Sequence, residues 1–245
     1  MISRISTGLR LLLVGLTSGL LACAGDDTIS ATASVPELLA HAERRLQDGD
    51  LNSATASYRR ALQKDSTSST AMLGLGRVYE VRGRLDMADR YRRRAFQLDY
   101  RRGTEARALG DLPMARKAFA AASHSLPGHP LASLQIGETW LEESAGDSAI
   151  AYLEATVLAD PRFVDARIQL GKAYLLAERT DEAQASFEAA IERNINAVDA
   201  YLHLGVIHAE RGEWAHAAAH YDRALLIRPS SQTARQGLAQ ARARL

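Results

Sequence analysis

The segment AQASFEAA, residues 183–190, contains the pattern that decides the fold: an alanine, an aromatic residue about one helical turn later, and another alanine about two turns from the first. Related segments occur six times along the chain. Their leading alanines are Ala54, Ala88, Ala115, Ala149, Ala183 and Ala217. Apart from one shorter step, between Ala88 and Ala115, they recur with a period of about 34 residues, which indicates a stack of similar structural units.

A second pattern precedes four of these alanines by just over three helical turns. It consists of Leu or Ile followed by Gly, with a ring-bearing side chain three positions later, as in Leu170-Gly171 and Tyr174. Glycine inside a helix costs about 1 kcal/mol relative to alanine, so its recurrence indicates that two helices approach closely there. Glycines near the middle of a repeat predict left-handed helix ends, and prolines close three repeats. They are Gly49, Gly83, Gly110 and Gly212, and Pro127, Pro161 and Pro229.

Together the patterns resemble the tetratricopeptide repeat, a helix–turn–helix unit, over roughly residues 35–229. The resemblance implies an all-α fold, a right-handed superhelical solenoid of about six repeats. Residues 230–245 are expected to form a capping helix with a polar outer face. Because no repeat can bury its apolar face alone, we expect one continuous core along the stack.

The third repeat begins seven residues early. Its first helix must fit within DYRRGTEARALGD, residues 99–111, and is expected to hold only about two turns. Asp99 and Arg102 stand where large apolar residues are usual. The missing turns predict a gap in the stack and a local kink. Simple drift in a tolerant repeat and a hinge or side pocket for a partner are both open interpretations.

The amino terminus has the form of an export signal. Residues 1–22 combine two arginines with a short apolar run, which is too short for a membrane-spanning helix. The segment resembles a bacterial lipoprotein signal, which implies cleavage before Cys23, lipidation of that residue, and a tether over residues 23–34. Ala24 favours the outer membrane by that family's sorting rule. The alternative is an ordinary cleaved signal in which Cys23 has no role.

The charge balance and the absence of certain motifs argue against several functions. Without residues 1–22 the chain has 28 basic and 29 acidic residues, which gives no electrostatic basis for nucleic-acid binding. There is no Walker-type phosphate loop and no GxSxG motif, so we expect neither an enzyme nor a cofactor. The arginine-rich segment 77–107 either forms an anion-binding patch or is a solvated, internally paired surface.

Four histidines in the last repeat raise the question of a metal. His216 and His220 are four residues apart on one helix, and His203 and His208 lie on the preceding helix. Such spacing can hold a metal ion, but no HExxH motif accompanies it. We therefore expect packing or exposed histidines and no metal, and keep a metal- or ligand-binding protein as the alternative of another class.

The resemblance also places a partner-binding groove along the first helices of the repeats. Counting from the repeat alanines, its most exposed position is apolar in all six repeats. The predicted groove residues are Leu39, Leu73, Arg77, Tyr100, Leu134, Leu141, Ile168, Lys172, Leu175 and Leu202. The Lys–Asn–Arg carboxylate clamp known in this family is absent, so we expect a groove that binds apolar side chains. The alternative is that these residues only pack between helices.

The function expected from these features is a non-catalytic protein- or peptide-binding scaffold. It would be held by lipid in the bacterial envelope, on the periplasmic face of the outer membrane, and would assist assembly of an envelope complex. A narrower alternative is a pilotin-like factor for secretin or type IV pilus biogenesis. Fold alone does not choose between them.

Overall fold

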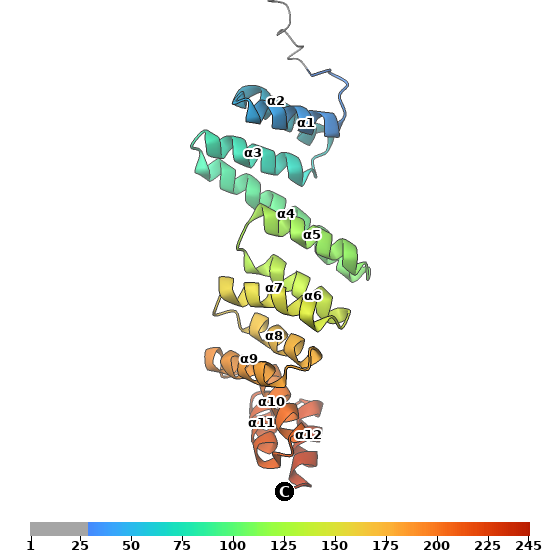
Figure 1. Ribbon diagram of the computed structural model, residues 1–245, viewed down its shortest axis with the longest axis vertical. Helices are drawn as coiled ribbons and strands as arrows, with labels where there is room; N and C mark the ends of the chain where they lie inside the picture. The colour runs from blue at the N-terminus through green and yellow to red at the C-terminus, as the bar shows by residue number, and fades with distance from the viewer. Residues whose placement is uncertain (1–28) are drawn as a thin grey trace, which may run out of the picture.

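A computed structural model describes residues 29–245, which form twelve α-helices and no strand (Figure 1). The helices are α1 (Val35–Gln47), α2 (Leu51–Lys64), α3 (Ser69–Val81), α4 (Leu85–Ala108), α5 (Leu112–Ser125), α6 (Pro130–Glu142), α7 (Gly146–Ala159), α8 (Val164–Leu176), α9 (Thr180–Arg193), α10 (Val198–Glu210), α11 (Trp214–Ile227) and α12 (Gln232–Arg242). They form an elongated stack with the start of the described chain and the carboxyl terminus at opposite ends (Figure 1). The predicted helical solenoid is confirmed.

The turns inside the repeats follow the predicted backbone geometry. Gly49, Gly83, Gly110 and Gly212 all have positive φ, as the sequence pattern indicated. In the fourth and fifth repeats Ser144 and Glu178 take the same conformation, at φ 57° and 58°. Left-handed backbone is costly for residues with a Cβ, so these two turns are held by the packing of their helices.

The third repeat differs from the expectation. Residues 99–108 are helical, but they are not a separate short helix. They continue the second helix of the preceding repeat, and together the two form the 24-residue helix α4. The connections between the other repeats have four residues, so the four residues of this connection and three helical residues are missing. The segment that serves as the first helix keeps ten residues instead of thirteen, and the chain does not fold back at this point.

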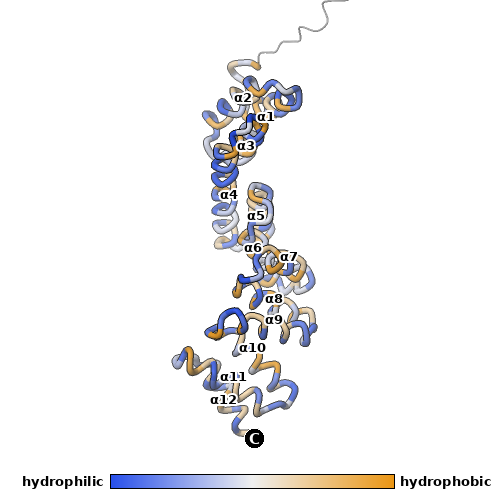
Figure 2. The backbone as a smooth tube through the Cα atoms, turned by 90° about the vertical axis from the view of Figure 1, so that its left-hand side faces the viewer, coloured by the Kyte–Doolittle hydropathy of each residue, from blue (hydrophilic) through white to orange (hydrophobic). Residues whose placement is uncertain are grey.

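The uninterrupted α4 divides the core, so the expectation of one continuous core is wrong. The first cluster of buried side chains extends from Ala33 to Ala88, with Tyr91 packed against it, and the next begins at Phe96. Later clusters are joined by shared residues such as Tyr100, Trp140 and Ile191. Figure 2 shows the largely hydrophilic α4 linking two groups of helices. We call these the N-terminal lobe, residues 29–95, and the C-terminal lobe, residues 96–245.

The segment before α1 is partly held in place. Arg60 donates to the carbonyl oxygens of Ser30 and Ala31, at 2.8 and 3.0 Å, and Lys64 donates to that of Ala33 at 2.7 Å. The end of the predicted tether therefore lies against α2 instead of being free. Cys23, the signal segment and the start of the tether lie outside the described residues. None of the described helices is long and apolar enough to cross a membrane.

Candidate binding groove

A cavity of about 550 Å³ lies along one side of the C-terminal lobe. It is lined by Arg107, Glu138, Leu141, Glu142, Gln169, Lys172, Leu175, Leu176 and His203. These residues come from α4, α6, α8 and α10, the first helices of the third to sixth repeats. Many are related by the repeat itself: Arg107, Leu141 and Leu175 hold equivalent positions in successive repeats, as do Gln169 and His203. The cavity is therefore part of a groove that runs across successive repeats.

The groove contains only some of the predicted residues. Leu141, Lys172 and Leu175 line it, as the repeat positions indicated. Leu134 and Ile168 were expected to be exposed there, but they are 5% and 7% exposed and belong to the core. Their position faces the neighbouring helices, so the packing interpretation applies to both. Leu39, Leu73, Tyr100 and Leu202 are half-buried and do not line the cavity.

The remaining predicted residue, Arg77, belongs to a polar cluster in the N-terminal lobe. Its guanidinium donates to both carboxylate oxygens of Glu43, and Tyr58 donates to the same carboxylate at 2.9 Å. The bond from Arg77 lowers the pKa of Glu43, so this carboxylate stays charged at neutral pH. Arg77 is therefore paired with Glu43 in a partly exposed cluster and does not line the cavity.

Some charged side chains of the groove have a partner within the described chain, and one does not. Arg107 donates to Glu138 at 2.6 Å and also pairs with Glu142, so both acids share one cation. Among the described residues, Lys172 makes no hydrogen bond or ion pair. Burial, together with the charge of Lys172, lowers the pKa of His203, which is therefore neutral at pH 7. Within the described chain, Lys172 is thus a half-buried cation without a partner, next to the apolar side chains of Leu141, Leu175 and Leu176.

Several lining residues were not predicted. Glu138, Glu142, Gln169 and Leu176 were missed because the sequence reading followed the apolar positions of each first helix and named only Arg77 and Lys172 among the polar residues. The repeat contains the signal that identifies two of them. Glu138 holds the position of Lys172 in the preceding repeat, and Gln169 likewise holds the position of His203. Equivalent positions on neighbouring first helices lie side by side in a solenoid.

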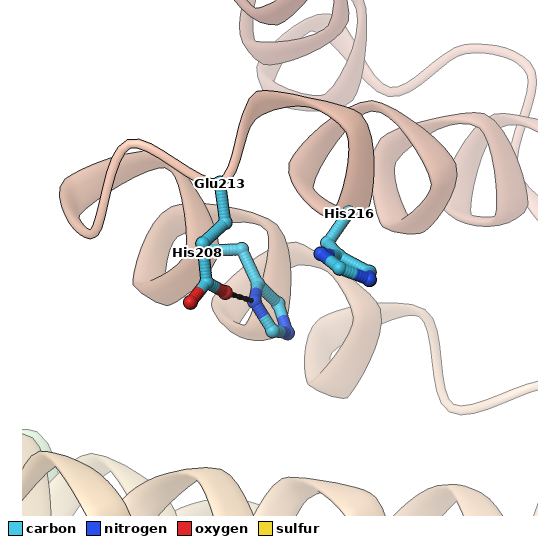
Figure 3. Close-up of side chains that lie close together, drawn as sticks. All are labelled: His208, Glu213 and His216. Atoms are coloured by element: carbon cyan, nitrogen blue, oxygen red, sulfur yellow. Dashed lines mark hydrogen bonds and ion pairs between the residues drawn. The ribbon is translucent and has the colours of Figure 1, made fainter.

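The histidines of the last repeat are brought together only in part. His208 and His216 lie close to each other and to Glu213, a residue the sequence reading did not connect with them (Figure 3). His220 stacks on His208 with a ring separation of 5.1 Å. His203 lies apart from this group, in the groove and against Phe187.

Comparison with known proteins agrees with this architecture. The model of the tetratricopeptide repeat family matches residues 39–95, 100–162 and 168–234. The chain therefore belongs to the tetratricopeptide repeat family. The boundary between the first two matches falls within α4, where the repeat period is interrupted. No curated protein matches this chain.

Solved structures share the fold at low sequence identity. The APC/C hetero-tetramer Cut9–Hcn1 is similar at 17% identity and a TM-score of 0.54, covering 85% of this chain and 42% of that one. This chain thus spans less than half of that protein's length. PilW, a widely conserved type IV pilus biogenesis factor, matches at 21% identity and a TM-score of 0.52, covering 83% and 98%. The C-terminal part of a TPR repeat-containing protein from Cytophaga hutchinsonii matches at 14% identity and a TM-score of 0.52, covering 85% and 89%.

Proposed function

We propose that this protein is a non-catalytic scaffold that binds a segment of a partner protein in the groove of its C-terminal lobe. The segment carries apolar side chains and one carboxylate. The observation that carries the proposal is Lys172, unpaired within the described chain, which lies among leucines in a groove of about 550 Å³. Family membership supports the class of function, because solenoids of this kind use extended concave surfaces for binding.

The chemistry of the segment follows from what the groove leaves unsatisfied. Leu141, Leu175 and Leu176 offer apolar surface, which favours apolar side chains in the partner. The acids Glu138 and Glu142 are already paired with Arg107, so they provide little attraction for a cation. A carboxylate placed at Lys172 would form a charge-assisted bond in a partly desolvated site, where such bonds are strong.

Selection from a displayed library of random peptides tests this proposal directly. We expect the selected peptides to combine apolar residues with an acidic side chain or a carboxyl terminus. Lys172→Glu should weaken their binding at least about tenfold, because it places like charges together. Lys117→Glu, an exposed position on α5 outside the groove, is the matched control and should leave the affinity unchanged. Peptides without acids, or an affinity that Lys172→Glu does not alter, would contradict the proposal.

We further propose that the scaffold works in the cell envelope, anchored through lipid on Cys23. The basis is the amino-terminal sequence, in which the chain's only cysteine follows a short apolar run. Labelled palmitate supplied to producing cells should enter the wild-type chain and not the Cys23→Ser variant. Fractionation should then place the wild type with membranes and the variant in the soluble fraction. An unlabelled wild type would eliminate the anchor without affecting the groove.

A further inference from the structure

The turn between α10 and α11 brings together three side chains of types that bind transition metals. His208 is in the last turn of α10, Glu213 is the residue immediately before α11, and His216 is in the first turn of α11 (Figure 3). One ligand atom from each lies within 4.8 Å of the others. His208 Nδ1 and Glu213 Oε2 are 2.5 Å apart. The carboxylate of Glu213 makes no bond to the start of α11 and is directed to the histidine instead.

Two other repeats have a different pair at these positions. Tyr79 and Tyr174 stand where His208 stands in its own repeat, and an arginine follows each of them by five residues. Arg84 and Arg179 lie over these tyrosine rings, at 5.9 and 4.7 Å from their centroids. In the last repeat His208 takes the place of the tyrosine and Glu213 that of the arginine. Two metal-ligand side chains thus occupy the positions that hold a cation–π pair elsewhere in the stack.

We propose that His208, Glu213 and His216 form a binding site for a divalent transition metal ion such as Zn²⁺. Two imidazoles and one carboxylate are ligands that Zn²⁺ accepts at about 2.0–2.2 Å, with water completing the tetrahedral set. The geometry leaves the site open, because His208 is buried while Glu213 and His216 are exposed. The exposed His216 can rotate to close the remaining distance. The bound ion would connect the two helices of the last repeat across their turn.

The electrostatic surroundings are compatible with a cation. The bond from His208 lowers the pKa of Glu213, which keeps this carboxylate charged. Burial, with the neighbouring His208 and His216, lowers the pKa of His220, so no positive charge resides on that ring at neutral pH. The nearby Arg211 is paired with Asp181 at 2.6 Å and directed away to α9. The site therefore has one negative charge close by, and the ring of His220 adds no positive charge to it.

Calorimetric titration of the full chain with ZnSO₄, without a polyhistidine tag, tests the site. We expect one Zn²⁺ per chain and a rise in thermal midpoint that depends on Zn²⁺ concentration. His216→Ala and Glu213→Gln should each weaken binding at least about tenfold, as loss of a ligand does. His124→Ala, an exposed histidine on α5, is the matched control and should bind like the wild type.

Two results would overturn the site. One is the absence of saturable Zn²⁺ binding to the wild type. The other is binding that survives in His216→Ala, a variant expected to fold because its side chain is exposed. His208→Ala is less decisive, since His208 is buried and its loss can disturb packing. Its circular dichroism without metal separates these effects: a native spectrum with lost binding supports the site, and a native spectrum with retained binding opposes it.

Discussion

At the scale of single residues, the repeat glycines have unequal roles. A Cβ on Gly171 would lie 2.6 Å from the ring of Phe187, which is fully buried. A Cβ on Gly76, at the same repeat position, would meet its nearest neighbours at 3.4 Å, an ordinary contact. The nearest side chain to that Cβ is the stem of Arg92, where four other repeats have Tyr58, Phe119, Phe187 or Tyr221. The two glycines hold the same position in the repeat, but the room available for a Cβ differs between them.

This difference predicts opposite effects of the same substitution. Gly171→Ala should lower the free energy of unfolding by about 1 kcal/mol, because overpacking of about 1–3 kcal/mol exceeds the gain of about 1 kcal/mol in helix propensity. Gly76→Ala should raise it by up to about 1 kcal/mol, because only the propensity gain remains. Chemical denaturation of both variants measures the two values. Equal effects at both glycines would show that space around Cβ is not the deciding quantity.

At the scale of helices, most elements were predictable and α4 was not. Apolar spacing, mid-repeat glycines and closing prolines located the helix pairs because each reports a local physical requirement. The loss of a connection is different, since residues 85–108 contain no proline or mid-repeat glycine to end the helix. The seven-residue deletion was read only as lost turns, although it removes the four-residue connection as well as three helical residues. Gly103, which lies against Phe119, shows that the third repeat keeps its first helix.

The groove was predictable to a similar, partial degree. Leu141, Lys172 and Leu175 followed from repeat positions, because those positions depend only on the helical period. Leu134 and Ile168 were misplaced, since a single position in a helix can face either the groove or the next helix. Which one it faces depends on how far adjacent repeats are rotated, a quantity that no local pattern contains. The pairing of Glu213 with His208 could not be predicted either, because it depends on the geometry of the turn between α10 and α11.

At the scale of the whole molecule, the two lobes have separate cores. Within residues 29–245, no buried or half-buried apolar residue is shared between the first cluster and the others, whereas the later clusters form a connected series. Polar contacts do bridge the boundary. Arg102 on α4 donates to the backbone and side-chain oxygens of Thr67, at 2.9 and 3.1 Å. Such exposed bonds contribute modestly compared with a shared core.

This division predicts two unfolding transitions. Both tryptophans, Trp140 and Trp214, lie in the C-terminal lobe, so their fluorescence reports that lobe alone, while circular dichroism reports both. Leu38→Ala should lower the stability of the N-terminal lobe by roughly 2–5 kcal/mol, because Leu38 is fully buried there. The circular dichroism curve should then gain an early phase, with the fluorescence midpoint unchanged.

The matched variant is Leu204→Ala in the C-terminal lobe, where Leu204 is 1% exposed. It should shift the fluorescence midpoint to lower denaturant. Should Leu38→Ala move the fluorescence and circular dichroism curves together by the same amount, the lobes unfold as one unit and the separate cores have no energetic consequence.

The continuous α4 also determines how the molecule carries a mechanical load. The two ends of the described chain lie at opposite poles, so tension between them passes through every helix pair in series (Figure 1). Within each lobe the repeats are joined by short connections, about which they can rotate slightly. The 24-residue α4, about 36 Å long, crosses the boundary between the lobes without such a connection. Tension therefore passes from one lobe to the other along a single unbroken helix.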